Sequence, residues 1–317
     1  MTRATLGGTS RVQLWQRILL VVLVLIVFTG AAVRLTASGL GCEDWPGCSQ
    51  DSFVPEADFH GLIEFGNRLL SGFVLIASLV VTGLIIRDRK PLERDLNYSK
   101  LANLNIAIVF GVITQAIVGL LTVRSVLDPR IVGIHFLLSI VLIDLGVRAL
   151  HELRVSNSAG VIIAPRPKFI NVVKTLLAVA IVLGVVVTGS GPNSGDTRAT
   201  RLGFDLTEVT RIHSVSVWLL IGFTLVAIYL NRSNIQAQKQ LFGFSALLVS
   251  QGAIGYTQFA IGVPPALVFA HVALATLIWT YVSQISMRNT SADRTLIDLR
   301  STATTNDSVA KITGIRG

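Results

Sequence analysis

Charged residues and cysteines are scarce in this sequence. Only 14% of its 317 residues are charged and 51% are hydrophobic, whereas about a quarter of the residues in a soluble domain are charged. An ordinary soluble fold is therefore excluded, and the composition predicts a polytopic membrane protein. The formal net charge of +9 is typical of Lys and Arg retained on the cytoplasmic side of a membrane, and we expect no nucleic-acid partner.

A cleavable leader is not expected. The first apolar run, about residues 17–33, follows a basic start, but no small-residue cleavage site comes after it. We therefore predict that this run remains as a membrane helix. It belongs to a set of eight apolar segments, each close to the ~20 residues needed to cross the hydrocarbon core. The segments cover residues 17–35, 62–86, 102–123, 132–150, 169–189, 212–230, 241–260 and 265–284.

Basic residues mark the expected cytoplasmic side. The connections 87–100 and 148–168 are rich in Arg and Lys, whereas the loops on the other side carry fewer basic groups. The positive-inside rule then places both termini in the cytoplasm. We expect a cytoplasmic N-terminus over 1–16, a cytoplasmic linker over 151–168, and a disordered cytoplasmic tail over 285–317, which lacks apolar periodicity.

The second half of the sequence repeats the first. Residues 114–119 (TQAIVG) match residues 250–255 (SQGAIG) at an offset of 136, and the same offset carries His135 onto His271. The sequence therefore predicts an all-α membrane protein whose eight transmembrane helices form two tandem, pseudo-symmetric four-helix bundles. The bundles are expected over residues 17–150 and 169–284.

Histidine is rare, and its positions are informative. Four of the five histidines lie at the outer ends of the predicted helices. His213 and His271 are expected at similar depth on non-adjacent helices, which is typical of two axial ligands to haem iron. The alternative is that each is a hydrogen-bonded packing residue. The four outer histidines are His60, His135, His213 and His271.

The first half departs from the second at one position. Asn67 falls opposite His213, and an amide is a poor iron ligand. The axial position opposite His135 would then be vacant, weakly held or filled by another group. His60 lies two turns before Asn67, roughly 10 Å away along the helix axis, so it would substitute only with a shifted haem or an irregular helix start.

Polar side chains form a stripe at the start of the second apolar segment. His60, Glu64, Asn67 and Arg68 are spaced for one helix face, and ionisable groups there are costly unless they face a protein interior or a cavity. Glu64 and Arg68 can form an ion pair that fixes the helix start. Alternatively, Glu64 supports positive charge or takes a proton at a substrate, while Arg68 or Arg34 binds an anionic group such as a propionate.

The two cysteines, Cys42 and Cys48, lie in the first external loop. Their spacing around a Pro-Gly turn allows a small disulfide, which an oxidising compartment favours. A metal site is the alternative, but it would need further ligands, and His60 is the candidate nearby. Whether a disulfide here is static or redox-active is left open.

Three motifs resemble those of the haem A synthase family. Residues 34–48 (RLTASGLGCEDWPGC) resemble its first-loop signature, residues 64–68 (EFGNR) its helix-2 motif, and residues 188–196 the exit of its fifth helix. The resemblance runs from the first apolar segment to the last. It implies an oxidoreductase that hydroxylates the C8 methyl of haem O and oxidises it to a formyl group. The product, haem A, serves the biogenesis of terminal oxidases.

The resemblance also implies roles for individual residues. It implies that His213 and His271 bind the iron of haem b, that Glu64 is catalytic, and that Cys42 and Cys48 form the loop disulfide. It further implies a substrate site for haem O in the first half. The residues expected around that haem are His135, Asn67, Arg68, His60 and Arg34.

Location and partners follow from the same resemblance. It implies a multi-pass protein of the bacterial plasma membrane, with the catalytic helix ends toward the outer face. Haem O synthase and an unidentified electron donor or acceptor are the expected partners, and a homo-oligomer is left open. A di-haem b-type electron carrier without substrate chemistry is the alternative. A transporter would need polar interruptions in mid-helix, whereas the polar groups here gather at the outer helix ends.

Overall fold

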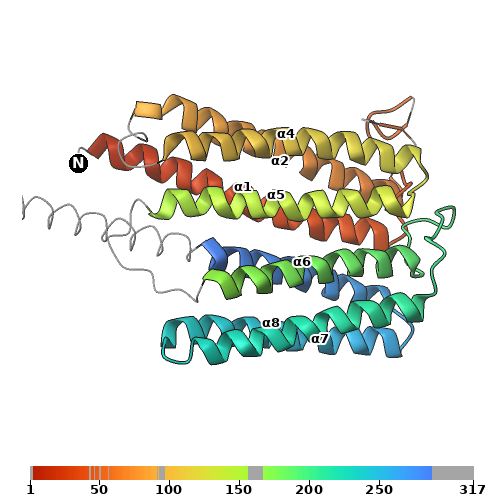
Figure 1. The fold of residues 1–317 in the computed structure, drawn as a ribbon. Coiled ribbons are helices and arrows are strands. Elements are labelled where there is room, and N and C mark those ends of the chain that lie inside the picture. The colour runs from red at the N-terminus through yellow and green to blue at the C-terminus, as the bar shows by residue number, and fades with distance from the viewer. Residues whose placement is uncertain are drawn as a thin grey trace, which may run out of the picture.

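Long helices run back and forth along one direction in the structure, a computed structural model (Figure 1). It describes residues 3–42, 44–45, 47–49, 51–55, 57–90, 92, 97–155 and 167–287. No strand occurs among these residues, so the described fold is all-α, as predicted. The long helices are α1 (Arg3–Leu35), α2 (Phe59–Arg87), α4 (Tyr98–Arg124), α5 (Pro129–Val155), α6 (Pro167–Ser190), α7 (Leu206–Leu230), α8 (Ile235–Ala260) and a last helix over Pro265–Met287.

Seven helices among the described residues are long and apolar enough to cross a membrane. The exception is α8, which contains the predicted span 241–260 and has 26 residues. Its length suffices, but polar side chains such as Ser250, Gln251 and Gln258 dilute its apolar sequence. The prediction of eight spans is thus confirmed for seven, while α8 lies where the eighth was predicted and is long enough but has a lower hydropathy.

Corresponding helices of the two halves begin with the same kind of cap. Asp58 caps α2, and its side chain accepts hydrogen bonds at 2.8 and 2.9 Å from backbone N–H groups of the first turn. Asp205 caps α7 in the same way at 2.9 Å. Such caps satisfy N–H groups that a helix start leaves unpaired. Asparagines cap the following helix of each half, Asn97 on α4 and Asn234 on α8.

The first four long helices close a ring. Helix α1 packs against α2 and α5, and α4 packs against the same two neighbours. In the rest of the chain, α6 packs against α7 and α7 against α8, while α5 contacts α6. Figure 1 shows the first group above the second, with the last helix in blue beside α6. The connections α1–α2, α4–α5, α6–α7 and α8–last helix all lie at the same end of the molecule (Figure 1).

A buried charge cluster joins the two groups of helices. Asp144 on α5, 8% exposed, pairs with Lys174 on α6 and, at 2.7 Å, with Arg148. The Lys174 ammonium also lies 5.1 Å from the ring centroid of Trp279 on the last helix. The Trp279 indole donates to the carbonyl of Ile140 at 2.9 Å. Charges at such depth need partners because their desolvation is costly, so this cluster connects α5, α6 and the last helix.

The ends of the chain and the linker are described only in part. Helix α1 already begins at Arg3, inside the expected N-terminal segment 1–16, although the apolar span itself begins at Ser10. Residues 156–166 of the expected linker and 288–317 of the expected tail lie outside the described residues. The predictions made for those stretches stay predictions.

Candidate functional site

The loop between α1 and α2 is closed by a disulfide between Cys42 and Cys48, as predicted. Both residues are buried against the protein. Over the described residues there is no free cysteine and no group of three side chains suited to a metal ion. The alternative of a cysteine metal site is therefore wrong, because both thiols are used in the disulfide.

Arg68 organises this loop from helix α2. Its Nη1 donates to the carbonyls of Asp44 and Gly47, both at 2.5 Å, and its Nη2 donates to the carbonyl of Cys42 at 3.3 Å. A guanidinium presents several donors in one rigid plane, so a single side chain can hold three points of the loop. The expected role of Arg68 in binding an anion stays a prediction.

Glu64 connects the same loop to α2 through both carboxylate oxygens. Oε1 accepts from Arg68 Nη2 at 2.5 Å, and Oε2 accepts from the backbone N–H of Cys42 at 2.8 Å. The two side chains are only 6% and 14% exposed. The ion pair considered from the sequence is therefore present, and it holds a buried carboxylate in one orientation.

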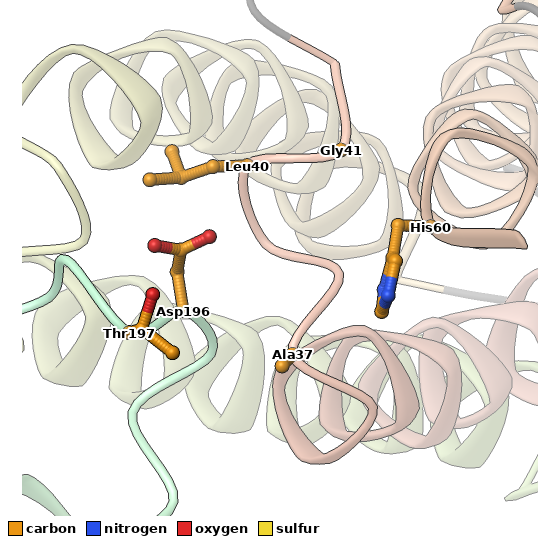
Figure 2. Close-up of a pocket in the computed structure, with 6 residues that line it drawn as sticks. All are labelled: Ala37, Leu40, Gly41, His60, Asp196 and Thr197. Carbon is orange, nitrogen blue, oxygen red and sulfur yellow. The ribbon is translucent and has the colours of Figure 1, made fainter. Parts of the chain in front are cut away.

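His60 lines a cavity of about 290 Å³ (Figure 2). Helix α2 starts regularly at Phe59, so the irregular start that would let His60 replace Asn67 does not occur. His60 Nδ1 lies 2.9 Å from Ser38 Oγ. Across the cavity, the Arg198 guanidinium donates to Asp196 at 2.9 Å and holds the pKa of that carboxyl below its usual value. The lining residues are Ala37, Leu40, Gly41, His60, Asp196 and Thr197.

Backbone and side-chain contacts join the α1–α2 loop of the first half to the α6–α7 loop of the second. Arg34, at the end of α1, donates to the carbonyl of Thr188 on α6 at 2.7 Å. The N–H of Gly39 donates to the carbonyl of Gly195 at 3.0 Å. Gly195 has φ +101°, and a Cβ there would lie 3.1 Å from Leu127, so glycine is required. The cavity beside His60 is thus shared by both halves.

The second half brings two imidazoles together. The ring centroids of His213 on α7 and His271 on the last helix are 6.5 Å apart, with the planes at 71°. A metal ion bound to one nitrogen of each ring at about 2 Å needs a separation of this size. The Nδ1 atoms of both rings are buried, and no described residue gives either of them a hydrogen-bond partner. A Cβ on Gly184 would lie 3.3 Å from His213 Cε1, so α6 leaves room for this ring. The residues therefore fit an iron held between two axial histidines.

The first half differs at the corresponding place. His135 on α5 has a buried Nδ1 without a partner, like the histidines of the second half. Asn67, however, is tied to α1, since its Oδ1 accepts from Thr29 Oγ1 at 2.7 Å. The first half therefore offers one imidazole, and the amide in place of the second is already hydrogen-bonded.

Two contact residues were not singled out from the sequence as site residues. Gln115 and Gln251 donate to the backbone carbonyls of His135 and His271, each at 3.0 Å. A signal was available, because both glutamines occupy the same place in the repeated segments. Thr29 had no such signal, since nothing in the spacing pairs it with Asn67.

Comparison with known proteins identifies the family of this chain. A model of the cytochrome oxidase assembly protein family, COX15-CtaA, matches residues 13–192. The heme A synthase of Lysinibacillus sphaericus is 32% identical over 120 residues, which are 38% of this chain and 37% of the relative. That of Oceanobacillus iheyensis is 30% identical over 115 residues, 35% of either chain. That of Shewanella oneidensis is 30% identical over 146 residues, 41% of this chain and 42% of the relative.

The extent of these matches differs. The alignments span less than half the length of the curated relatives, between 35% and 42% in these three. The family model, in contrast, covers more than half of the chain and includes the disulfide loop, Glu64, His135 and the end of α6. The chain belongs to the COX15-CtaA family of cytochrome oxidase assembly proteins.

Proposed function

We propose that this protein is a haem A synthase, a membrane oxidoreductase that converts haem O to haem A. One observation carries the proposal: two halves built alike differ at their outer ends. The second half holds two imidazoles 6.5 Å apart, whereas the first has Asn67 in that place and adds the buried carboxylate of Glu64. The second half suits a permanently bound haem, and the first suits a haem on which chemistry occurs.

Haem b is the cofactor proposed for the second half. His213 and His271 would be its axial ligands, and the fit of their ring separation supports this assignment. When bound, haem b supplies one-electron transfer. The contribution of the chain is to hold both rings in place and to keep the site dry, since the Nδ1 atoms are buried.

Haem O is the proposed substrate of the first half, with His135 as its protein ligand. Arg34 supports binding of a propionate there, because its Nε is buried and has no partner among the described residues. His60, at the outer edge, is proposed to face the same end of the substrate. Asn67 and Arg68 are proposed to line the site, and Arg68 acts on it mainly by holding Glu64.

Glu64 is proposed as the catalytic carboxylate. Arg68 and the Cys42 N–H fix its two oxygens before substrate binds, which removes the cost of orienting the group during reaction. In this position the carboxylate stabilises positive charge or takes the proton released while the methyl group of haem O is oxidised. The disulfide loop is part of this arrangement because Cys42 supplies one of the two donors.

The proposed membrane arrangement follows the sequence prediction. We place α1 to α5 and α6 to the last helix as two tandem, pseudo-symmetric four-helix bundles, and the matched Asp and Asn caps support this. Both termini are placed in the cytoplasm of a bacterial cell, and the end with the disulfide loop faces outward. Haem O synthase and an electron donor or acceptor are the proposed partners.

A di-haem electron carrier is the second candidate, because the Glu64–Arg68 pair also has a structural explanation. Mass analysis of haems extracted from the protein, after co-expression with a haem O synthase, separates the two. Haem A together with haem B supports the synthase. Haem B alone, with unmodified haem O present in the cells, would establish the carrier. Cells without the haem O synthase are the control, and they should yield no haem A.

A further inference from the structure

The same sequence element on α4 and α8 contacts a histidine of the following helix. Gln115 Nε2 donates to the backbone carbonyl of His135, and Gln251 Nε2 donates to that of His271, at 3.0 Å in both cases. The repeat in the sequence therefore reproduces a hydrogen bond between helices. Such bonds between membrane helices favour one relative height and rotation of the two helices.

A glycine one turn after each glutamine faces the same histidine. A Cβ on Gly255 would lie 3.0 Å from His271 Cε1 and 3.5 Å from its Nδ1. A Cβ on Gly119 would lie 3.6 Å from His135 Cε1. Each glycine thus leaves space for one edge of an imidazole, and the space is tighter in the second half.

The contact at Gly255 also distinguishes the two ring nitrogens of His271. Among the described residues, Cε1 and Nδ1 of His271 are the side-chain atoms within 4 Å of a Cβ on Gly255. Nε2 therefore lies farther from that Cβ than Nδ1 does. A metal-bound histidine is oriented by contacts of this kind around its ring and its backbone.

We propose that Gln-x-x-x-Gly on α4 and α8 is a histidine cradle, in which Gln115 and Gln251 are positioning residues. In each half the glutamine sets the height of the histidine backbone and the glycine makes room for the Cε1 edge of the ring. In the second half this contact leaves Nε2 as the nitrogen farther from Gly255, where it faces iron. The inference rests on the proposed haem sites. The proposal adds that each half has its own cradle. A substitution in one cradle should therefore affect binding of the haem in that half only.

The first-half cradle contains one further hydrogen bond. Gln115 Nε2 also lies 2.6 Å from Ser139 Oγ, which itself donates to the His135 carbonyl at 3.1 Å. The corresponding residue of the second half, at the offset of 136, is Ala275. Loss of Gln115 therefore leaves one side-chain donor on the histidine carbonyl, whereas loss of Gln251 leaves none from a side chain.

Transfer of haem b from the full-length protein to excess apomyoglobin tests the second cradle. In Gln251→Met, which keeps side-chain length but removes the donor, we expect transfer about 10- to 100-fold faster than in the unchanged protein and a shifted low-spin electron paramagnetic resonance signal. Ser250→Ala is the control, because Ser250 is exposed and bonds only within its own helix. Gln115→Met should leave this haem unchanged and weaken binding of added haem O instead.

Substitution of the glycines tests the proposed cradle independently of the glutamines. Gly255→Ala should shift the same resonance signal because the new methyl lies 3.0 Å from the ring, whereas Gly252→Ala has nothing within 4 Å and should not. If the unchanged protein holds low-spin haem b and neither Gln251→Met nor Gly255→Ala alters its transfer or signal, the cradle is refuted and the proposed function stands. If the unchanged protein holds no haem b, both are refuted.

Discussion

The carboxylate of Glu64 accepts a hydrogen bond from the backbone N–H of Cys42 at 2.8 Å. One residue belongs to the stripe on α2 and the other to the disulfide loop, 22 positions earlier in the chain. The polar stripe on α2 and the disulfide loop are separate in the sequence but are joined in one structural unit. A substitution in one of them should therefore alter the structure or stability of the other.

Substitution of Glu64 tests its proposed catalytic role. Glu64→Gln keeps the size of the side chain but removes the charge that pairs with Arg68. We expect formation of haem A to fall about 10²- to 10⁴-fold, while haem b stays bound because its proposed ligands lie on α7 and the last helix. The ratio of haem A to haem B in extracts measures this. Formation of haem A at the unchanged rate would contradict a catalytic carboxylate.

Gly41 should tolerate no side chain. A Cβ there would lie 2.5 Å from both the carbonyl carbon and the oxygen of His60, and backbone cannot move aside as a flexible side chain can. We expect Gly41→Ala to destabilise the protein by about 1–3 kcal/mol, measured as a lower thermal unfolding midpoint in detergent. Gly66→Ala is the matched control, because Gly66 lies on α2, the helix of His60, and a Cβ there would have no described atom within 4 Å. Equal midpoints would contradict the close approach of loop and helix.

Asn67→His should make the first half resemble the second. The change removes the bond from Thr29 Oγ1 and introduces an imidazole where the other half has His213. In Asn67→His, we expect added haem O to give the low-spin spectrum of an iron with two nitrogen ligands. In Asn67→Ala, we expect added haem O to give no such low-spin spectrum. The optical spectrum of the reduced protein distinguishes the outcomes. Identical spectra for the two variants would show that position 67 does not face the haem iron.

Asp144→Asn should weaken the contact between α5 and α6, which joins the two groups of helices. The change leaves the Lys174 ammonium, 14% exposed, without its charged partner. Removing one member of a buried ion pair costs about 3–5 kcal/mol, so the unfolding midpoint should fall. Glu208→Gln is the comparison, because its pair with Arg211 is 63–70% exposed and such pairs contribute about 0–1 kcal/mol. A similar midpoint for both variants would rule out a stabilising cluster.

Much of the fold could be predicted because it depends on local sequence. Apolar length placed the helices, and α2 begins at Phe59 within three residues of the predicted start. At the eighth predicted span the helix α8 formed with sufficient length, but its polar side chains give it a lower hydropathy than the other seven helices have. The repeat located both glutamine-glycine elements, but spacing alone could not show that the glutamines bond to histidine carbonyls.

The sequence by itself determined the helices, the repeat and the family motifs and favoured the disulfide, because these depend on neighbouring residues and on the thickness of a membrane. Only the tertiary structure decided that Glu64 holds Cys42, that Arg34 reaches Thr188, and that the rings of His213 and His271 lie 6.5 Å apart. Those contacts depend on how each helix is rotated and shifted against its neighbours. Packing of the whole chain sets that rotation, and no local pattern contains it.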